Sequence, residues 1–97
     1  MKITIGSVDY EVVMDEHLGE NQLGECHYKE QKILLNSSLS KDIKEAVFWH
    51  EVLHAILEQS GRKQDEKLVN ELSYAISGVL KNVSFSLFER VCSQQQI

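Results

Sequence analysis

The chain has 97 residues, of which 42% are hydrophobic and 26% are charged, a composition typical of one folded domain and not of a disordered or fibrous protein. Fifteen acidic side chains against ten basic ones give a net charge of −5, so direct nucleic-acid binding, which needs concentrated positive charge, is disfavoured. No apolar run reaches the length of a signal peptide or of a membrane-spanning helix. We therefore expect a cytoplasmic protein without membrane association.

The first third of the chain has the alternation of polar and apolar residues that is typical of β-strands. Apolar residues occupy every second position within 2–5 and 8–14, and Gly6-Ser7 lies between the two runs, which predicts a hairpin with one buried face. The polar stretch from Asp15 to Gly24 predicts a loop. Residues 25–28 and 32–35 predict a second hairpin. Together they predict a small antiparallel sheet.

Two helices are predicted after the strands. Ser40 is a suitable N-cap for a helix that starts at Lys41 and ends before Gly61, and apolar residues around most of this helix predict a central position in the fold. A second amphipathic helix is expected over 64–81. Its core-facing stripe is expected to comprise Leu68, Leu72, Ala75 and Val79. The predicted fold is α+β, one domain over 1–97, in which the sheet packs on the central helix and a second helix.

The end of the chain and the cysteines allow less specific predictions. Residues 83–97 are expected to be a frayed tail or a regulatory segment, or else a short third helix that packs through Phe85, Phe88 and Val91. Cys26 and Cys92 are far apart in the sequence and lack Cys-x-x-Cys spacing, so we expect reduced, semi-buried thiols.

The central predicted helix contains one motif with chemical content, His50-Glu51-Val52-Leu53-His54. Residues four apart share a helix face, so His50 and His54 can present two imidazole nitrogens to a single zinc ion. Glu51 is rotated by about 100° from His50 and is better placed to act as a general base for a water molecule. Chance would produce roughly 0.02 such motifs in a chain of this composition. The motif therefore predicts a zinc site suited to hydrolysis.

A catalytic zinc site usually has three protein ligands and one open position. The candidates for the third ligand are His17, His27, Glu58, Glu66 and Glu71. On the helical wheel Glu71 flanks the expected core stripe of the second helix, whereas Glu66 is expected on the opposite, solvated side. Glu58 is the main rival, but three ligands along one straight helix would converge poorly. We therefore predict Glu71 as the third ligand, and surface roles for His17 and His27.

The motif followed by Glu71 in a second amphipathic helix resembles the gluzincin arrangement of zinc peptidases. Its small form is similar to the ImmA/IrrE-like metallopeptidase domains and the single-domain minigluzincins of bacteria and phages. The resemblance covers residues 30–82. It implies that His50, His54 and Glu71 are zinc ligands and that Glu51 is the general base. It also implies that the strand at 32–36 borders the substrate cleft, although that strand could instead be an interior one.

The leading functional hypothesis is a zinc-dependent metallopeptidase with a protein or peptide substrate. The alternative is a non-catalytic, zinc-containing protein-binding module, with Cys26 or His27 as a fourth ligand. The sequence identifies no oxyanion donor, because Tyr28 and Tyr74 are both expected to be packing residues. It also predicts neither the identity of the substrate nor the oligomeric state.

Overall fold

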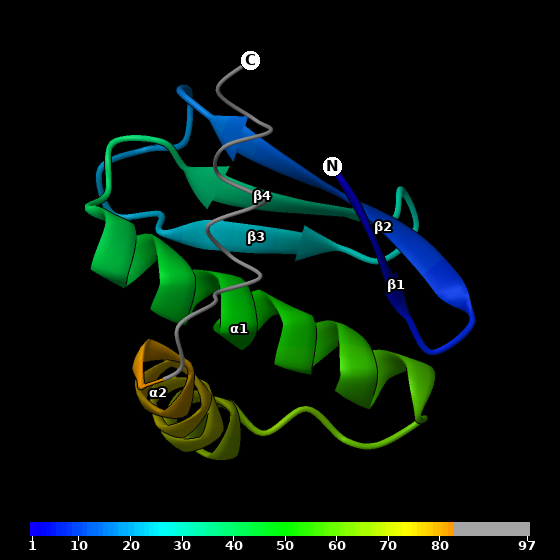
Figure 1. Cartoon of the computed structure of the whole chain (residues 1–97). Helices are drawn as coiled ribbons and strands as arrows, with labels where there is room; N and C mark the ends of the chain where they lie inside the picture. Colours follow the sequence, from blue (N-terminus) through cyan, green and yellow to red (C-terminus); the bar gives the residue numbers. More distant parts are fainter. Residues whose placement is uncertain (83–97) are drawn as a thin grey trace.

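The computed structural model describes residues 1–82, which form a four-stranded sheet and two helices (Figure 1). The strands are β1 (Lys2–Ile5), β2 (Val8–Asp15), β3 (Gly24–His27) and β4 (Lys32–Asn36). The α+β class and both predicted hairpins are confirmed. Residues 83–97, for which we expected a tail, a regulatory segment or a third helix, lie outside the described residues, and so does Cys92.

The sheet is mixed, so the prediction of a purely antiparallel sheet was wrong. The hairpins β1–β2 and β3–β4 are antiparallel, but β2 pairs with β4 in parallel, and the strand order is β1-β2-β4-β3. The parallel register places Val12 beside Ile33 in the middle of the sheet, where both are fully buried. The most apolar strands therefore occupy the centre. Strand β4 is an interior strand, and β3 is the edge strand on the side of the helices.

The central helix α1 (Lys41–Gln59) packs on the sheet through Phe48, Val52 and Ala55. Its boundaries follow from local chemistry, as predicted. The Ser40 hydroxyl accepts a hydrogen bond from a backbone N–H in the first turn. At the other end Gly61 has a positive φ of 68°, a conformation that glycine adopts without steric cost, and it ends the helix in a Schellman-type turn.

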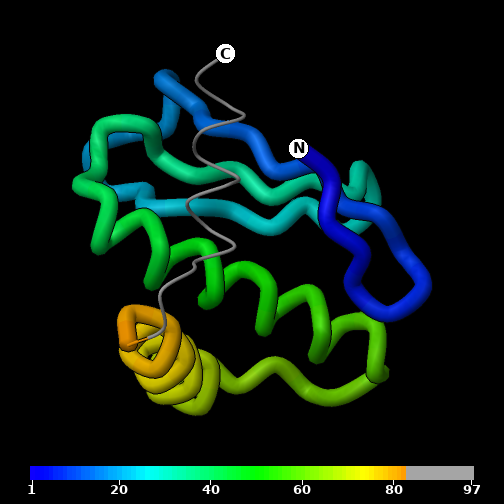
Figure 2. The backbone as a smooth tube through the Cα atoms, in the orientation of Figure 1, coloured from blue at the N-terminus to red at the C-terminus, as the bar shows by residue number. Residues whose placement is uncertain are grey.

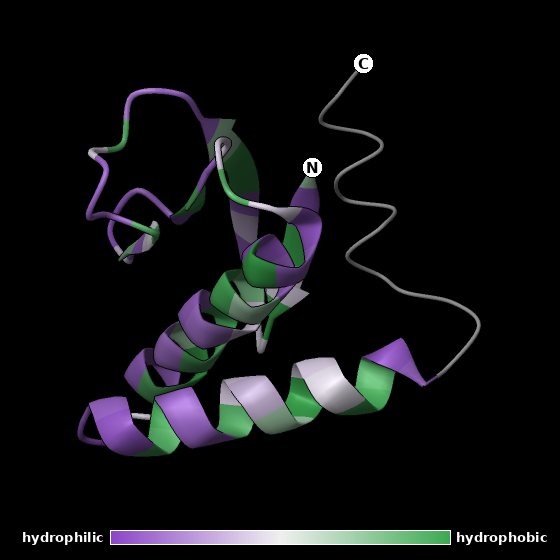
Figure 3. Ribbon diagram, turned by 90° about the vertical axis from the view of Figure 1, so that its left-hand side faces the viewer, coloured by the Kyte–Doolittle hydropathy of each residue, from purple (hydrophilic) through white to green (hydrophobic). Residues whose placement is uncertain are grey.

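The second helix α2 (Glu66–Lys81) lies on the side of α1 that faces away from the sheet (Figure 1). Figure 2 shows the connection 60–65 leaving the end of α1 and turning back beneath it. Figure 3 shows α2 crossing α1 obliquely. The fold thus has three layers, with α1 between the sheet and α2. Neither described helix combines the length and the apolar composition needed to cross a bilayer.

The face that α2 turns towards α1 differs from the predicted one. Its buried residues are Val69, Ser73 and Ser77. Both serine hydroxyls donate to backbone carbonyls three residues earlier, which satisfies their polar groups within the helix. Small, internally satisfied side chains allow two helices to approach closely. By contrast, Leu68 and Leu72 of the predicted core stripe are 42% and 41% exposed.

Gly24 allows the edge strand β3 to lie close to α1. A Cβ atom at this position would lie 2.7 Å from the Val47 side chain and 3.0 Å from the Leu34 carbonyl oxygen, which belongs to the backbone and cannot easily move. We expect Gly24→Ala to lower the free energy of unfolding by about 1–3 kcal/mol, as overpacked sites generally do. Urea denaturation measures the change. Gly19→Ala is the matched control, because a Cβ there meets nothing within 4 Å. Equal stability of the two variants would contradict this account of the contact.

Candidate metal centre

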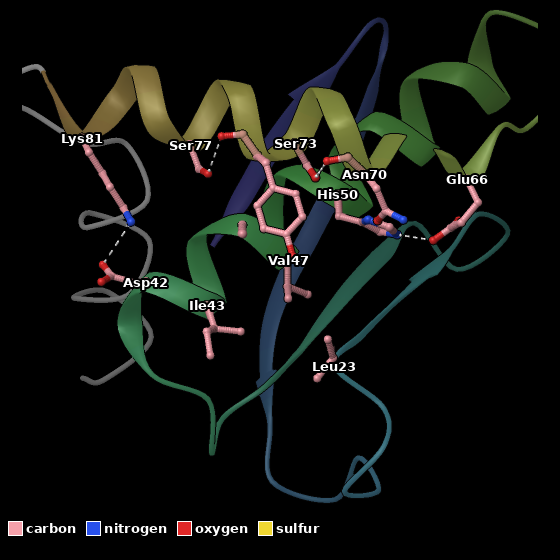
Figure 4. Close-up of a pocket in the computed structure, with 12 residues that line it drawn as sticks. Leu23, Asp42, Ile43, Val47, His50, Glu66, Asn70, Ser73, Ser77 and Lys81 are labelled. Carbon is pink, nitrogen blue, oxygen red and sulfur yellow. Dashed lines mark hydrogen bonds and ion pairs between the residues drawn. The ribbon is translucent and has the colours of Figure 1, made fainter. Parts of the chain in front are cut away.

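Three side chains from the two helices converge at the crossing of α1 and α2. They are His50, His54 and Glu66, and we call them the metal group. The Nε2 atoms of His50 and His54 are 3.2 Å apart, and the two carboxylate oxygens of Glu66 lie 3.0 Å and 2.9 Å from them, respectively. Figure 4 shows the Glu66 carboxylate directed at His50. Among the described residues this is the one group of three or more His, Cys, Asp or Glu side chains close enough to hold a metal ion.

The donor atoms of this group fit a zinc ion. Two imidazole nitrogens and one carboxylate oxygen are a common catalytic zinc set, and ligand atoms around a tetrahedral zinc are about 3.3 Å apart. The observed separations of 2.9–3.2 Å are close to this value. The side chain of Glu66 is 64% exposed, so the group is open to solvent on one side. The group therefore has the composition and the openness of a site with a free coordination position.

The helices place these groups through their packing. Because Phe48, Val52 and Ala55 face the sheet, the histidines on the other side of α1 face α2. Glu66 lies in the first turn of α2, where the helix dipole favours a negative charge, and it is one turn before the buried Val69.

Burial lowers the pKa of His50 below its ordinary value, although the neighbouring Glu66 carboxylate opposes this shift. A lowered pKa favours the neutral imidazole, which is the form that binds metal ions. The electrostatics of the group therefore agree with its donor geometry.

Glu51 lies between α1 and the edge strand, with its Cγ next to the position of Gly24. It is only 8% exposed, and this burial raises the pKa of its carboxyl to about 7, while the nearby His54 acts in the opposite direction. A carboxyl that is half-ionised near neutral pH and lies beside the histidines has the properties of a general base. The role of Glu51 as general base stays a prediction.

A pocket of about 440 Å³ extends from the metal group along the space between α1 and α2. It begins at His50 and Glu66, and the ion pair between Asp42 and Lys81 lies at its far end, with a distance of 3.7 Å (Figure 4). Its apolar lining includes Leu23, Ile43, Ala46 and Val47. The pocket can hold an apolar side chain next to the metal group.

The structure does not bring the predicted third ligand Glu71 to the histidines. Glu71 is exposed on α2 and lies outside the group, whereas Glu66, which we expected on the solvated side, is part of it. The helical wheel was oriented on the apolar residues Leu68 and Leu72, but α2 turns Val69 and the two serines towards α1. This rotation carries Glu66 onto the inner face. The geometry therefore favours Glu66 over Glu71.

The remaining ligand candidates lie outside the group. Glu58 and His17 are exposed. The His27 ring is 2.8 Å from Glu25 and does not join the metal group, and Cys26 is a free, half-buried thiol. Among the described residues, neither proposed fourth ligand of a closed structural zinc site is therefore in place.

One signal in the sequence could have identified Glu66. Glu66, Val69, Ser73 and Ser77 recur at helical spacing and form a stripe of small and polar residues. Such a stripe permits close helix packing, but hydrophobicity alone ranks it below the leucine stripe on the neighbouring face. No pattern in the sequence marked Asn70 or Lys81 as residues that line the pocket.

The chain matches no family model, no curated protein and no solved structure. The motif and the geometry around it are therefore the basis for a functional assignment.

Loss of a side chain that hydrogen-bonds to a metal ligand weakens metal binding roughly 10- to 100-fold. We expect Glu66→Ala to weaken Zn²⁺ binding by more than this. The reason is that Glu66 provides the only carboxylate in the group. Competition with a chromophoric chelator measures the affinity. Glu71→Ala is the matched control on the same helix and should bind Zn²⁺ as the wild type does. Loss of the ion from the Glu71 variant alone would restore the sequence-based assignment and contradict ours.

Proposed function

We propose that this protein is a zinc-dependent metallopeptidase in which His50, His54 and Glu66 hold the ion and Glu51 is the general base. The observation that carries the proposal is the convergence of the Glu66 carboxylate on both histidine Nε2 atoms beside the buried Glu51. The order of these residues along two successive helices supports the gluzincin-like assignment. Zn²⁺ in such a site would lower the pKa of water towards neutrality and polarise a peptide carbonyl.

The protein's own residues would supply the proton transfers. The ionised Glu51 carboxylate accepts a proton from the attacking water and then donates it to the leaving amine. Its burial between α1 and β3 shields the carboxylate from bulk water. The exposed side of Glu66 leaves a path by which a substrate reaches the site.

Two surfaces next to the site support a peptide as the substrate. Among residues 1–82 the edge strand β3 pairs with β4 alone, so its other side can pair with an extended peptide backbone. The apolar pocket begins at His50 and is large enough for an apolar side chain of that peptide. We therefore propose that β3 borders the substrate cleft, a place that the family resemblance implied for the strand at 32–36.

The non-catalytic alternative has less support. A closed structural zinc site would need a fourth protein ligand, and among the described residues neither Cys26 nor His27 lies with the histidines. A buried Glu51 with a raised pKa would also have no role in a purely structural site.

We expect Glu51→Gln to retain Zn²⁺ and to lower the rate of peptide hydrolysis by about 10²- to 10⁴-fold, because glutamine is nearly isosteric but cannot accept the proton. Cleavage of an unstructured protein substrate, followed by mass spectrometry, measures the rate. Glu58→Gln, an exposed position on the same helix, is the matched control and should retain activity. Undiminished cleavage by the Glu51 variant would contradict the assigned base.

A further inference from the structure

The side chain of Gln64 connects three separate segments next to the metal group. Gln64 lies in the connection between α1 and α2, two residues before Glu66. Its Oε1 is 2.7 Å from His54 Nδ1, and its Nε2 is 3.0 Å from the His54 carbonyl oxygen and 3.3 Å from the Tyr28 hydroxyl. We propose that Gln64 is a positioning residue that sets the tautomer and the orientation of His54 for metal binding.

The direction of the amide group determines the tautomer of His54. A backbone carbonyl can only accept a hydrogen bond, so the group that faces the His54 carbonyl must be the Gln64 NH₂. The amide oxygen of Gln64 then faces His54 Nδ1, and it can only accept. Nδ1 must therefore carry the imidazole proton. In the neutral imidazole that a metal ion requires, the lone pair then lies on Nε2, the atom that faces His50 and Glu66.

The same amide also restrains the segment that leads to Glu66. Its bonds to α1 and to Tyr28, in the turn after β3, hold residue 64 against both elements. Asp65 follows as the N-cap of α2 and accepts a hydrogen bond from Leu68 N–H at 3.1 Å. Glu66 then begins the helix. Gln64 thus lies between a ligand that it contacts directly and a ligand whose position depends on its segment.

His50 has a comparable partner. The side chain of Asn70, one turn after Glu66 on α2, lies beside His50 in Figure 4, and it acts to raise the pKa of His50. Each imidazole of the group therefore has a carboxamide from outside α1 beside it. Neutral carboxamides fix the ring orientation and add no charge to the group.

The inference deepens the proposed function and rests on it for the identity of the ion, but it can be tested separately. Gln64→Leu removes both the acceptor and the donors. Gln64→Glu retains an acceptor for His54 Nδ1 and loses the donors to the His54 carbonyl and Tyr28. We expect Gln64→Leu to weaken Zn²⁺ binding by about 10- to 100-fold and Gln64→Glu to stay within a few-fold of the wild type. Chelator competition measures both affinities, and thermal unfolding verifies that both variants fold.

The metal-free protein provides a second measurement. Nitrogen-15 NMR of the imidazole should show His54 protonated at Nδ1 in the wild type and in Gln64→Glu, and a mixture of tautomers in Gln64→Leu. Equal Zn²⁺ affinities and identical tautomers in all three proteins would overturn the inference. An equal loss in both variants would also overturn it, since Gln64 would then act only by anchoring the loop. Failure of the wild type to cleave peptides, with the tautomer pattern intact, would refute the proposed function but not the role of Gln64.

Discussion

The packing of one face of α1 against the sheet is the constraint on which the candidate site depends. Phe48, Val52 and Ala55 fill that contact and are almost completely buried. With 3.6 residues per turn, their positions fix the rotation of the helix about its axis. His50 and His54 must then face away from the sheet, and Glu51 must lie beneath the edge strand. The positions of adjacent residues in the motif therefore follow from a single hydrophobic interface.

The second requirement is a close approach of α2 to the histidine face of α1. Ser73 and Ser77 make this possible because they are small and because their hydroxyls are satisfied within α2. The start of α2 then lies over His50 and His54, and the first helical residue is Glu66. The hydrogen bonds of Gln64 restrain the connection between the two helices at the same point. The metal group is thus a product of helix termini and helix crossing, and not of one helix alone.

The sequence was sufficient for features that depend on local chemistry. The alternation of polar and apolar residues predicted the strands that the structure contains. Ser40 and Gly61 predicted the two ends of α1, and the structure has both. The motif predicted two histidines on one face, and the structure brings their Nε2 atoms together.

Features that depend on tertiary packing were not predictable in the same way. The parallel pairing of β2 and β4 depends on how two hairpins associate, and alternation carries no information about this. The rotation of α2 was predicted from hydrophobicity, which selected the leucines. In the structure the small serines are buried against α1, where they allow close packing. Leu68 and Leu72 remain about two-fifths exposed. That one difference moved the candidate for the third ligand from Glu71 to Glu66.

The central claim is that His50, His54 and Glu66 together hold a zinc ion, and anomalous diffraction at the zinc absorption edge tests it most directly. Crystals grown with Zn²⁺ should give one strong anomalous peak, about 2.0–2.2 Å from both histidine Nε2 atoms and from an oxygen of Glu66. A peak coordinated by Glu71 in place of Glu66, or no peak at the two histidines, would contradict the account.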